Sequence, residues 1–306
     1  MTAPKTVYFL AGLPRSGSTL LANILAQNPC FHVTPTSGIL DMLVQVRNAW
    51  DRNDSLRAMD RAQSLRAKED VLRAMLQGWF ARVEQPVCLD KNRYWAEFLE
   101  MAATLVGGRD RVRVLMTVRD LRDILASFER LYRSTSSLGQ VPLEGNNLVK
   151  SKTALGRLEM WIDDAQPVGR AYNAVRDAVT RGWKDCLHFV EYDALTREPA
   201  AVLAGIYRFL GEAPHEHDFQ RVAQVTFEDD LEYGFRDLHT IRARVEPQPP
   251  QWPRVYDDAV FQSGPWRTIE SVAQFWKLYQ EPGRGLPAPL RQPAGMTVPT
   301  RPVGRG

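Results

Sequence analysis

A short run of residues near the amino terminus combines glycine, hydroxyl side chains and arginine in a pattern that can bind phosphate. The pattern is Gly12-x-x-x-x-Gly17-x-Thr19, and it follows directly on an apolar run. Its spacing is that of the loops that hold the phosphates of ATP and GTP, where a lysine after the second glycine contacts the β- and γ-phosphates. Here that position holds Ser18, and a cation stands earlier in the loop, at Arg15. We therefore expect a phosphate site that fits a nucleoside triphosphate less well.

Backbone geometry explains how this loop can bind an anion. Gly17 lets the chain turn without a Cβ clash, so that successive N–H groups point inward. The helix expected from Ser18 onward adds its unpaired N–H groups and the positive end of its dipole. The hydroxyls of Ser16, Ser18 and Thr19 are further donors, and the forked guanidinium of Arg15 matches a tetrahedral oxyanion. The alternative is an ordinary strand–turn–helix connection built of small residues.

A second candidate anion site stands further along the chain. Arg119 directly follows an apolar run, and Ser127 lies about two helical turns later, so its hydroxyl can point back over the same ligand. The alternative makes Arg119 an ion-pair partner of Asp120 or Asp123 and Ser127 a surface residue. Two such sites on one sheet edge favour a ligand with two phosphate groups.

The elements that must position these residues alternate between strand and helix. Apolar runs of strand length lie at residues 7–13, 31–34, 87–89, 112–118 and 187–192. Helical patterns lie at residues 19–27, 37–50, 68–83, 94–106, 121–132, 154–180 and 200–210, with Trp79, Trp95 and Trp161 expected in the core. This alternation predicts an α/β protein: a P-loop-containing nucleotide-hydrolase-like three-layer fold with a central parallel β-sheet flanked by helices. In such a sheet ligands bind beyond the carboxyl ends of the strands, where both candidate sites stand.

Composition argues against several classes of protein. The chain has 306 residues and a formal net charge of +3, so no strong basic field indicates a nucleic-acid partner. Cys30, Cys88 and Cys186 are far apart, which predicts reduced core thiols and no metal site. Neither a secretory signal nor a membrane-spanning run is found, so we expect a cytoplasmic protein without a membrane partner.

Two stretches and the tail read as irregular. Residues 134–152 are rich in Ser, Gly, Asn and Pro and predict a long loop at the substrate entrance, and residues 238–253 carry basic residues followed by prolines. Residues 1–280 are predicted to form a single α/β domain. The Pro- and Gly-rich residues 281–306 predict an extended or flexible tail.

Three motifs together resemble one enzyme family. Leu13-Pro14-Arg15-Ser16-Gly17-Ser18-Thr19-Leu20 is similar to the 5′-phosphosulfate loop of sulfotransferases that use 3′-phosphoadenylyl sulfate (PAPS). Val118-Arg119-Asp120 followed by Ser127 resembles their 3′-phosphate motif. Residues 189–195, with Pro199 and residues 207–211, resemble their later strand and helix. The resemblance runs from about residue 7 to about residue 245, and it is closest to the bacterial and tyrosylprotein sulfotransferase branch.

The resemblance implies a cofactor and its ligands. PAPS would be the donor, adenosine 3′,5′-bisphosphate the product, and no metal would be needed. The implied cofactor-binding residues are Arg15, Ser16, Gly17, Ser18, Thr19, Arg119, Ser127, Tyr192 beside the adenine, and Thr240 and Arg242 in a segment that closes over the nucleotide. Arg15 and Lys91 are the implied stabilisers of the oxygen that leaves the sulfur. The alternatives are a solvated basic loop around Arg242 and a surface pair between Lys91 and Asp90.

The expected base is missing from its usual place. The tyrosylprotein branch has a glutamate just after the second strand, and Thr36 stands at that position here. A threonine is no base at neutral pH without a partner. The replacements open from the sequence are His32, Asp41, a residue distant in sequence such as His239, or an acidic acceptor that needs only a weak base.

The acceptor side is expected around the end of the second strand. Thr34, Thr36 and Ser37 follow that strand at the same sheet edge as the phosphate loop, although Ser37 also suits the role of helix N-cap.

The leading hypothesis is therefore a sulfotransferase that moves a sulfuryl group by in-line transfer from PAPS to a hydroxyl or amine of a small-molecule or peptide acceptor. The alternatives are a P-loop NTPase or small-molecule kinase, which the serine at position 18 disfavours, and a non-catalytic nucleotide-binding relative. The sequence indicates neither the acceptor nor an oligomeric state.

Overall fold

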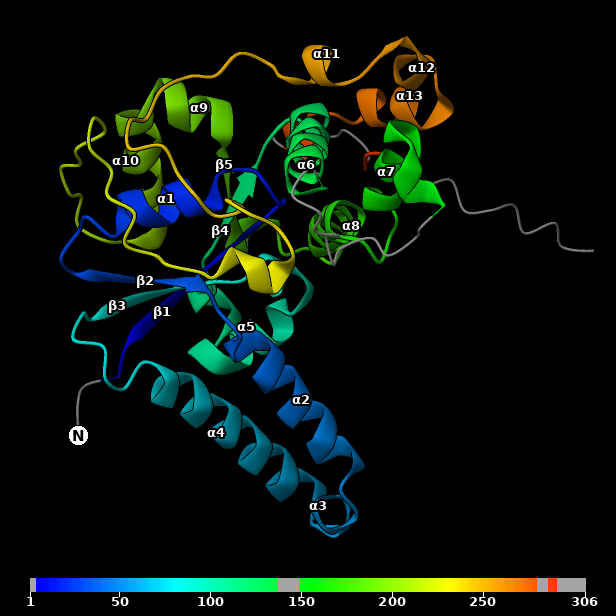
Figure 1. Ribbon diagram of the computed structural model, residues 1–306. Coiled ribbons are helices and arrows are strands. Elements are labelled where there is room, and N and C mark those ends of the chain that lie inside the picture. The colour runs from blue at the N-terminus through cyan, green and yellow to red at the C-terminus, as the bar shows by residue number, and fades with distance from the viewer. Residues whose placement is uncertain (1–3, 137–148, 280–285, 291–306) are drawn as a thin grey trace, which may run out of the picture.

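Short apolar runs form one parallel sheet in the computed structural model, which describes residues 4–136, 149–279 and 286–290 (Figure 1). The described residues form a five-stranded sheet in the order β2-β3-β1-β4-β5, and each neighbouring pair is parallel. The strands are β1 Thr6–Gly12, β2 Phe31–Thr36, β3 Val87–Lys91, β4 Val114–Val118 and β5 Leu187–Glu191. The predicted α/β fold with a parallel sheet is thus confirmed.

Helices follow the strands and cover both faces. The α-helices are α1 Ser18–Leu25, α2 Ile39–Arg52, α3 Asp54–Ala58, α4 Arg61–Trp79, α5 Leu99–Val106, α6 Leu121–Ser136, α7 Ala154–Trp161, α8 Pro167–Thr180, α9 Tyr192–Arg197, α10 Pro199–Leu210, α11 Trp252–Val255, α12 Asp258–Phe261 and α13 Gly264–Ser271. The 3-10 turns are η1 Arg93–Glu97, η2 Arg109–Arg111, η3 Lys150–Lys152, η4 Lys184–Cys186, η5 Asp230–Tyr233 and η6 Phe275–Tyr279.

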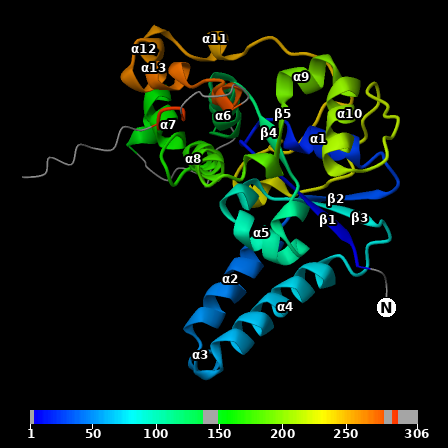
Figure 2. The ribbon, with the colours of Figure 1, turned by 180° about the vertical axis from the view of Figure 1, so that it is seen from behind.

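The sheet is the middle of three layers because successive side chains of a strand point to opposite faces. Leu10 of β1 belongs to an apolar cluster with α1 and α10, whereas Phe9 belongs to a second cluster with α5, α6 and α8. Both side chains are fully buried. Figures 1 and 2 show these two sets of helices on either side of the sheet.

The strand order places the two candidate phosphate motifs together. β1 and β4 are neighbours, with Gly12 paired to Thr117. The chain leaves β1 toward β2 on one side and leaves β4 toward β5 on the other. Parallel sheets bind ligands in the crevice that such diverging connections leave. The loop that contains Arg15 and the residue Arg119 therefore share one edge of the sheet.

An antiparallel pair of helices, α2 and α4, projects from this body (Figures 1 and 2). α4 begins earlier than predicted, at Arg61, and ends at Trp79. The prediction that Trp79 lies in the core is wrong, because its side chain on this projecting helix is 51% exposed. Trp95 and Trp161 are buried, as predicted.

Other predicted elements need correction. The helical pattern of residues 154–180 is two helices, α7 and α8, and the second begins at Pro167, which disfavours helical backbone in the residue before it. The carboxyl-terminal helices that were not predicted bury Trp266 and Trp276 in the core that also holds α6 and α8. Cys30 is exposed, whereas Cys88 and Cys186 are buried as predicted.

The predicted loop and tail are described only in part. Residues 137–148 of the loop and residues 281–285 and 291–306 of the tail lie outside the described residues. Within residues 286–290, Leu290 is buried and the carbonyl of Ala288 accepts a hydrogen bond from the Tyr172 hydroxyl at 2.5 Å, so this piece packs on the body. In the described part of the chain no helix has the length and apolar character needed to cross a membrane. The division at residue 280 stays a prediction.

Candidate functional site

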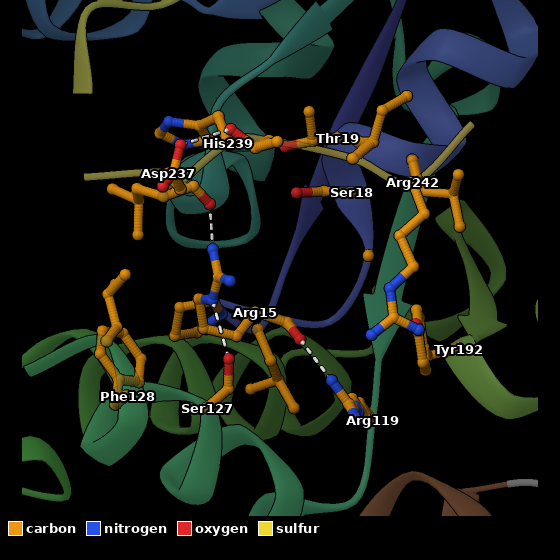
Figure 3. Close-up of a pocket in the computed structure, with 18 of the residues that line it drawn as sticks. Arg15, Ser18, Thr19, Arg119, Ser127, Phe128, Tyr192, Asp237, His239 and Arg242 are labelled. Carbon is orange, nitrogen blue, oxygen red and sulfur yellow. Dashed lines mark hydrogen bonds between the residues drawn. The ribbon is translucent and has the colours of Figure 1, made fainter. Parts of the chain in front are cut away.

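A cavity of about 770 Å³ opens at the carboxyl ends of the strands (Figure 3). Its walls are the loop after β1 with the start of α1, the end of β4 with α6, and a segment of residues 236–251 that arrives from the far end of the chain. Of the residues predicted to hold the cofactor, those that line it are Arg15, Gly17, Ser18, Thr19, Arg119, Ser127, Tyr192, Thr240 and Arg242. The fold thus brings together residues separated by more than two hundred positions in sequence.

The phosphate loop has the backbone that its glycines predict. Gly12 and Gly17 have φ angles of +144° and +89°, and Arg15 between them also has a positive φ of +58°. A Cβ on Gly12 would lie 2.3 Å from the carbonyl oxygen of Thr117, and one on Gly17 would lie 2.6 Å from the ring of Tyr192. α1 begins directly afterwards, at Ser18, so its amino terminus faces the cavity.

The hydroxyls of the loop divide into two roles. Ser18 and Thr19 line the cavity. Ser16 is buried, and its hydroxyl lies 2.5 Å from the carbonyl of Leu13 and 2.7 Å from Oγ1 of Thr117. Ser16 therefore fastens the loop to β4, and the structure does not bring its hydroxyl to the cavity.

Arg15 reaches across the cavity from the loop. Its Nε donates to Oγ of Ser127 on α6 at 3.1 Å, and its Nη1 donates to the carbonyl of Leu238 (Figure 3). Burial, and then the neighbouring charge of Arg119, lower the pKa of Arg15 to about 10. Both effects disfavour the charged guanidinium, and a bound anion would stabilise it.

Arg119 carries a donor without a partner. It lies over the ring of Tyr192, with its guanidinium carbon 4.4 Å from the ring centre. Its Nη2 is 3.6 Å from Oδ2 of Asp123, and its Nη1 donates to the carbonyl of Arg15 at 3.5 Å. Its Nε is buried and has no hydrogen-bond partner among the described residues. Since buried donors are almost always paired, this N–H indicates a missing acceptor in the cavity.

The other predicted nucleotide residues also line the cavity. Tyr192 begins α9 and presents its ring to the cavity beside Gly17. Thr240 and Arg242 line the same cavity from the carboxyl-terminal segment, and both are exposed (Figure 3). Figure 3 shows the Arg242 guanidinium beside the Tyr192 ring, and an aromatic ring with a guanidinium near it suits a flat base.

Lys91 stands at the end of β3 and is buried, with 5% of its surface exposed. Its Nζ donates to Oγ1 of Thr19 at 3.2 Å and to Oε1 of Glu228 at 2.8 Å. Burial lowers the pKa of Lys91, although the Glu228 carboxylate opposes this shift. The partner of Lys91 is therefore Glu228, and the surface pair with Asp90 is not formed, because Asp90 points away into the core.

The residues expected on the acceptor side are only partly brought to the cavity. Thr36 lines it, and its backbone N–H donates to Oε1 of Glu228 at 2.9 Å. Thr34 is buried, and its hydroxyl accepts the backbone N–H of Lys91 at 2.8 Å, so it positions that lysine. Ser37 is also buried, and its Oγ accepts the N–H of Ile39 at 3.2 Å; the N-cap position of α2 is Gly38, so the prediction of Ser37 as the N-cap is wrong.

The structure does not bring two of the candidate bases to the site. His32 stands near the start of β2, with its ring centre 6.1 Å from that of Phe80 at the end of α4. It does not line the cavity, because the carboxyl end of β2 is the end that reaches the cavity. Asp41 is exposed on the first turn of α2. His239, in contrast, lines the cavity.

Two acidic residues beside His239 escaped prediction. Glu228 and Asp230 come from a segment between α10 and α11 that forms no α-helix or strand in the described residues. Glu228 is almost fully buried, with 4% of its side chain exposed. Burial raises the pKa of its carboxyl, but the charge and hydrogen bond of Lys91 outweigh burial and lower it overall. No sequence motif marks these residues. The one signal was the threonine at position 36 in place of a glutamate, which indicated that another segment must supply the base.

Asp90 leads to a prediction about stability. It is fully buried, Oδ1 accepts from Nε1 of Trp95 at 2.8 Å, and Oδ2 has no partner among the described residues. Burial raises the pKa of Asp90 to about 6, although hydrogen bonds from Ser37 and Trp95 oppose the shift. Because the folded state holds this proton more tightly than the unfolded chain, its stabilising effect is full below about pH 4 and is lost as the pH rises through 6.

We therefore expect Asp90→Asn to raise the free energy of unfolding by about 3 kcal/mol relative to the wild type at pH 8, and by little at pH 4. Urea denaturation of both proteins at the two pH values measures this. A difference that is the same at both pH values would contradict the assignment of a buried, charged Asp90.

The described residues contain no group of three or more His, Cys, Asp or Glu side chains placed to hold a metal ion. Arginines, a lysine, hydroxyls and the amino terminus of α1 line the cavity. Such a set can hold anionic groups and stabilise negative charge that develops on an oxygen.

Comparison with known proteins finds a matching family model and similar solved structures. A family model described as "Sulfotransferase family" matches residues 8–216. The sulfotransferase domain of the olefin synthase of Synechococcus PCC 7002 has a similar structure, with a TM-score of 0.50 and 18% identity over 86% of this chain and 92% of that chain. A sulfotransferase from Alicyclobacillus acidocaldarius (TM-score 0.45, 15% identity, 78% of this chain and 89% of that one) is also similar. So is mouse sulfotransferase SULT7A1, whose structure is a complex with PAP (TM-score 0.47, 13% identity, 90% and 87%). No curated protein matches the sequence.

Proposed function

The chain belongs to the sulfotransferase family, and from this premise we propose that it transfers a sulfuryl group from PAPS to a hydroxyl or amine of a small-molecule or peptide acceptor. One observation carries the choice of donor. Arg15 and Arg119 point into the same cavity, the pKa of Arg15 is lowered by burial and by Arg119, and the Nε of Arg119 is buried without a partner. Two neighbouring guanidinium groups in one cavity, one of them with a buried unpaired N–H, fit a ligand with two separate anionic groups, as PAPS has.

The residues present fit the parts of PAPS. The backbone of the loop, the amino terminus of α1, Arg15 and Thr19 would hold the 5′-phosphosulfate. Arg119 and Ser127 would hold the 3′-phosphate. The ring of Tyr192 would lie by the adenine. When bound, PAPS supplies an activated sulfuryl group on its 5′-phosphate.

The chain's own contribution is positioning and charge stabilisation. Transfer of this kind, like phosphoryl transfer, needs the acceptor, the sulfur and the departing oxygen in line, with little covalent help. Lys91 is hydrogen-bonded to Thr19 at the start of α1, and so it stands where negative charge on the departing oxygen would develop. Ser18 leaves the loop without the lysine that serves a γ-phosphate.

A ligand-stabilisation experiment tests the donor. We expect adenosine 3′,5′-bisphosphate at one hundred times its Kd to stabilise the protein by about 2.7 kcal/mol, with adenosine 5′-monophosphate weaker because it lacks the group that Arg119 would hold. Thermal unfolding with each nucleotide, and with ATP and Mg²⁺, measures this. Stabilisation by ATP and Mg²⁺ alone would overturn the proposal in favour of a nucleoside triphosphatase or kinase. Bisphosphate binding without turnover of labelled PAPS on a broad acceptor panel would indicate a non-catalytic relative.

A further inference from the structure

Thr36, which stands at the expected place of the base, is hydrogen-bonded to a carboxylate from a distant segment of the chain. Thr36 cannot accept a proton at neutral pH, and its backbone N–H is bound to Oε1 of Glu228, 192 positions later in the chain. The segment that carries Glu228 also carries Asp230 and His239. A proton acceptor for the acceptor hydroxyl must therefore be sought on this segment.

The ring of His239 is fixed through one nitrogen and leaves the other available. Its Nδ1 lies 2.6 Å from Oδ1 of Asp230 and 3.3 Å from Oε2 of Glu228. Its backbone N–H donates to Oδ2 of the same Asp230 at 2.9 Å. Since both neighbours of Nδ1 are carboxylate oxygens, Nδ1 carries the proton and Nε2 of the neutral ring has the lone pair. No described residue hydrogen-bonds Nε2, and His239 lines the cavity (Figure 3).

Two chains of contacts tie His239 to the region where the sulfuryl group would lie. The carbonyl of Leu238, the preceding residue, accepts from Arg15. Glu228, beside the ring, binds Lys91 at 2.8 Å, and Lys91 in turn binds Thr19 at 3.2 Å. The imidazole thus stands next to the groups proposed to hold the transferring group, on the side where Thr36 lines the cavity.

Glu228 is less suited than His239 to take the proton. One of its oxygens already accepts from both Lys91 and Thr36, and its side chain does not line the cavity. Lys91 also holds it in the charged form with a lowered pKa, which makes it a weak base. Its place behind the ring instead lets it help to stabilise a charged imidazolium.

We propose that His239 is the general base of the sulfuryl transfer and that Asp230, through Nδ1, is the residue that positions its ring. This proposal rests on the proposed function. In the step, Nε2 takes the proton of the acceptor hydroxyl as the oxygen forms its bond to sulfur. The bond between sulfur and the 5′-phosphate oxygen breaks, and adenosine 3′,5′-bisphosphate leaves with that electron pair. The imidazolium, stabilised by Asp230, then releases the proton to solvent.

The surroundings of His239 define the expected pH dependence. Lys91 from β3, Glu228, and Asp230 and Tyr233 of η5 face it. Burial and then Lys91 lower the pKa of His239, although both carboxylates oppose the shift. The ring is therefore neutral and able to act as a base at neutral pH, and the turnover rate should fall as the pH falls into the acidic range.

Substitution of His239 by asparagine removes Nε2 but keeps an N–H for Asp230. With labelled PAPS and a series of phenols, we expect the rate of His239→Asn to fall about 100-fold or more for phenol. The loss should be small for p-nitrophenol, which ionises near neutral pH without help. The affinity of His239→Asn for adenosine 3′,5′-bisphosphate should equal that of the wild type. The control is His188→Asn, which should keep wild-type rates. The His188 ring stacks on Phe209 and does not line the cavity. Equal loss across the phenols, or none, overturns the proposal.

Asp230→Asn tests whether Asp230 positions the ring of His239. This variant should shift the acidic limb of the pH–rate profile, which a purely structural role would leave in place.

A readout independent of turnover completes the test. In ¹⁵N NMR spectra, His239 of the wild type should be neutral at pH 7 with its proton on Nδ1, and a proton on Nε2 overturns the proposal even if no phenol is an acceptor. Failure of the wild type to bind adenosine 3′,5′-bisphosphate, in contrast, overturns the proposed function.

Discussion

Substitution of Arg119 by methionine should lower the affinity for adenosine 3′,5′-bisphosphate about 100-fold, equivalent to about 2.7 kcal/mol. The guanidinium is buried over Tyr192, and its Nε has no partner among the described residues. Methionine keeps much of the apolar contact with the ring but removes every donor. Isothermal titration calorimetry of the folded variant measures the change.

Arg113→Met is a matched control. Arg113 precedes β4, whereas Arg119 follows it, and the Arg113 guanidinium packs on Phe209 and donates to its carbonyl at 3.1 Å. It does not line the cavity. The same substitution there should leave the nucleotide affinity unchanged. If Arg119→Met binds as tightly as this control, Arg119 does not hold the 3′-phosphate.

Substitution of Gly12 by alanine should destabilise the fold by at least about 3 kcal/mol. The φ angle of Gly12 is +144°, and an added Cβ would lie 2.3 Å from both the carbonyl oxygen and Oγ1 of Thr117. β1 and β4 pair at this point, so neither strand can move without breaking the sheet at its centre. Urea denaturation at neutral pH measures the loss.

The matched control is Gly78→Ala. Gly78 lies in α4 with open space around its would-be Cβ. Alanine there should raise the free energy of unfolding by about 0.5 kcal/mol, because it is the better helix former. A Gly12→Ala variant as stable as Gly78→Ala would show that the loop does not need the conformation described.

The parts of the fold and site that sequence could predict are local ones. The family resemblance and the α/β fold are confirmed. The loop from Gly12 to Thr19 and the pair Arg119 and Ser127 each follow an apolar strand, and in a parallel sheet those strand ends must meet at one edge. That rule brings Arg15 and Arg119 to one edge of the sheet, and the observed pairing of β1 with β4 brings them to one cavity.

What could not be predicted depends on packing over long distances in the chain. His32 was expected in a strand of residues 31–34, but β2 extends to Thr36, so His32 stands further from the carboxyl end that reaches the cavity. The sequence pattern predicts Trp79 as a core residue, but α4 projects from the body and leaves this side chain exposed. Glu228 and Asp230 stand in a segment without periodic pattern, and their roles arise only from contacts with Lys91, Thr36 and His239.

The segment that carries these residues has a consequence for the order of events in folding. Residues 218–245 contain no α-helix or strand, and they are fastened to the amino-terminal half by Asn23, Thr36, Lys91 and Arg15, through bonds that span from 137 to 223 positions. Contacts of such separation form late, because a long loop must close before they form. We therefore expect the sheet and its phosphate loop to form before this last wall of the cavity. We also expect this wall, which contains no α-helix or strand, to open more readily than the sheet does.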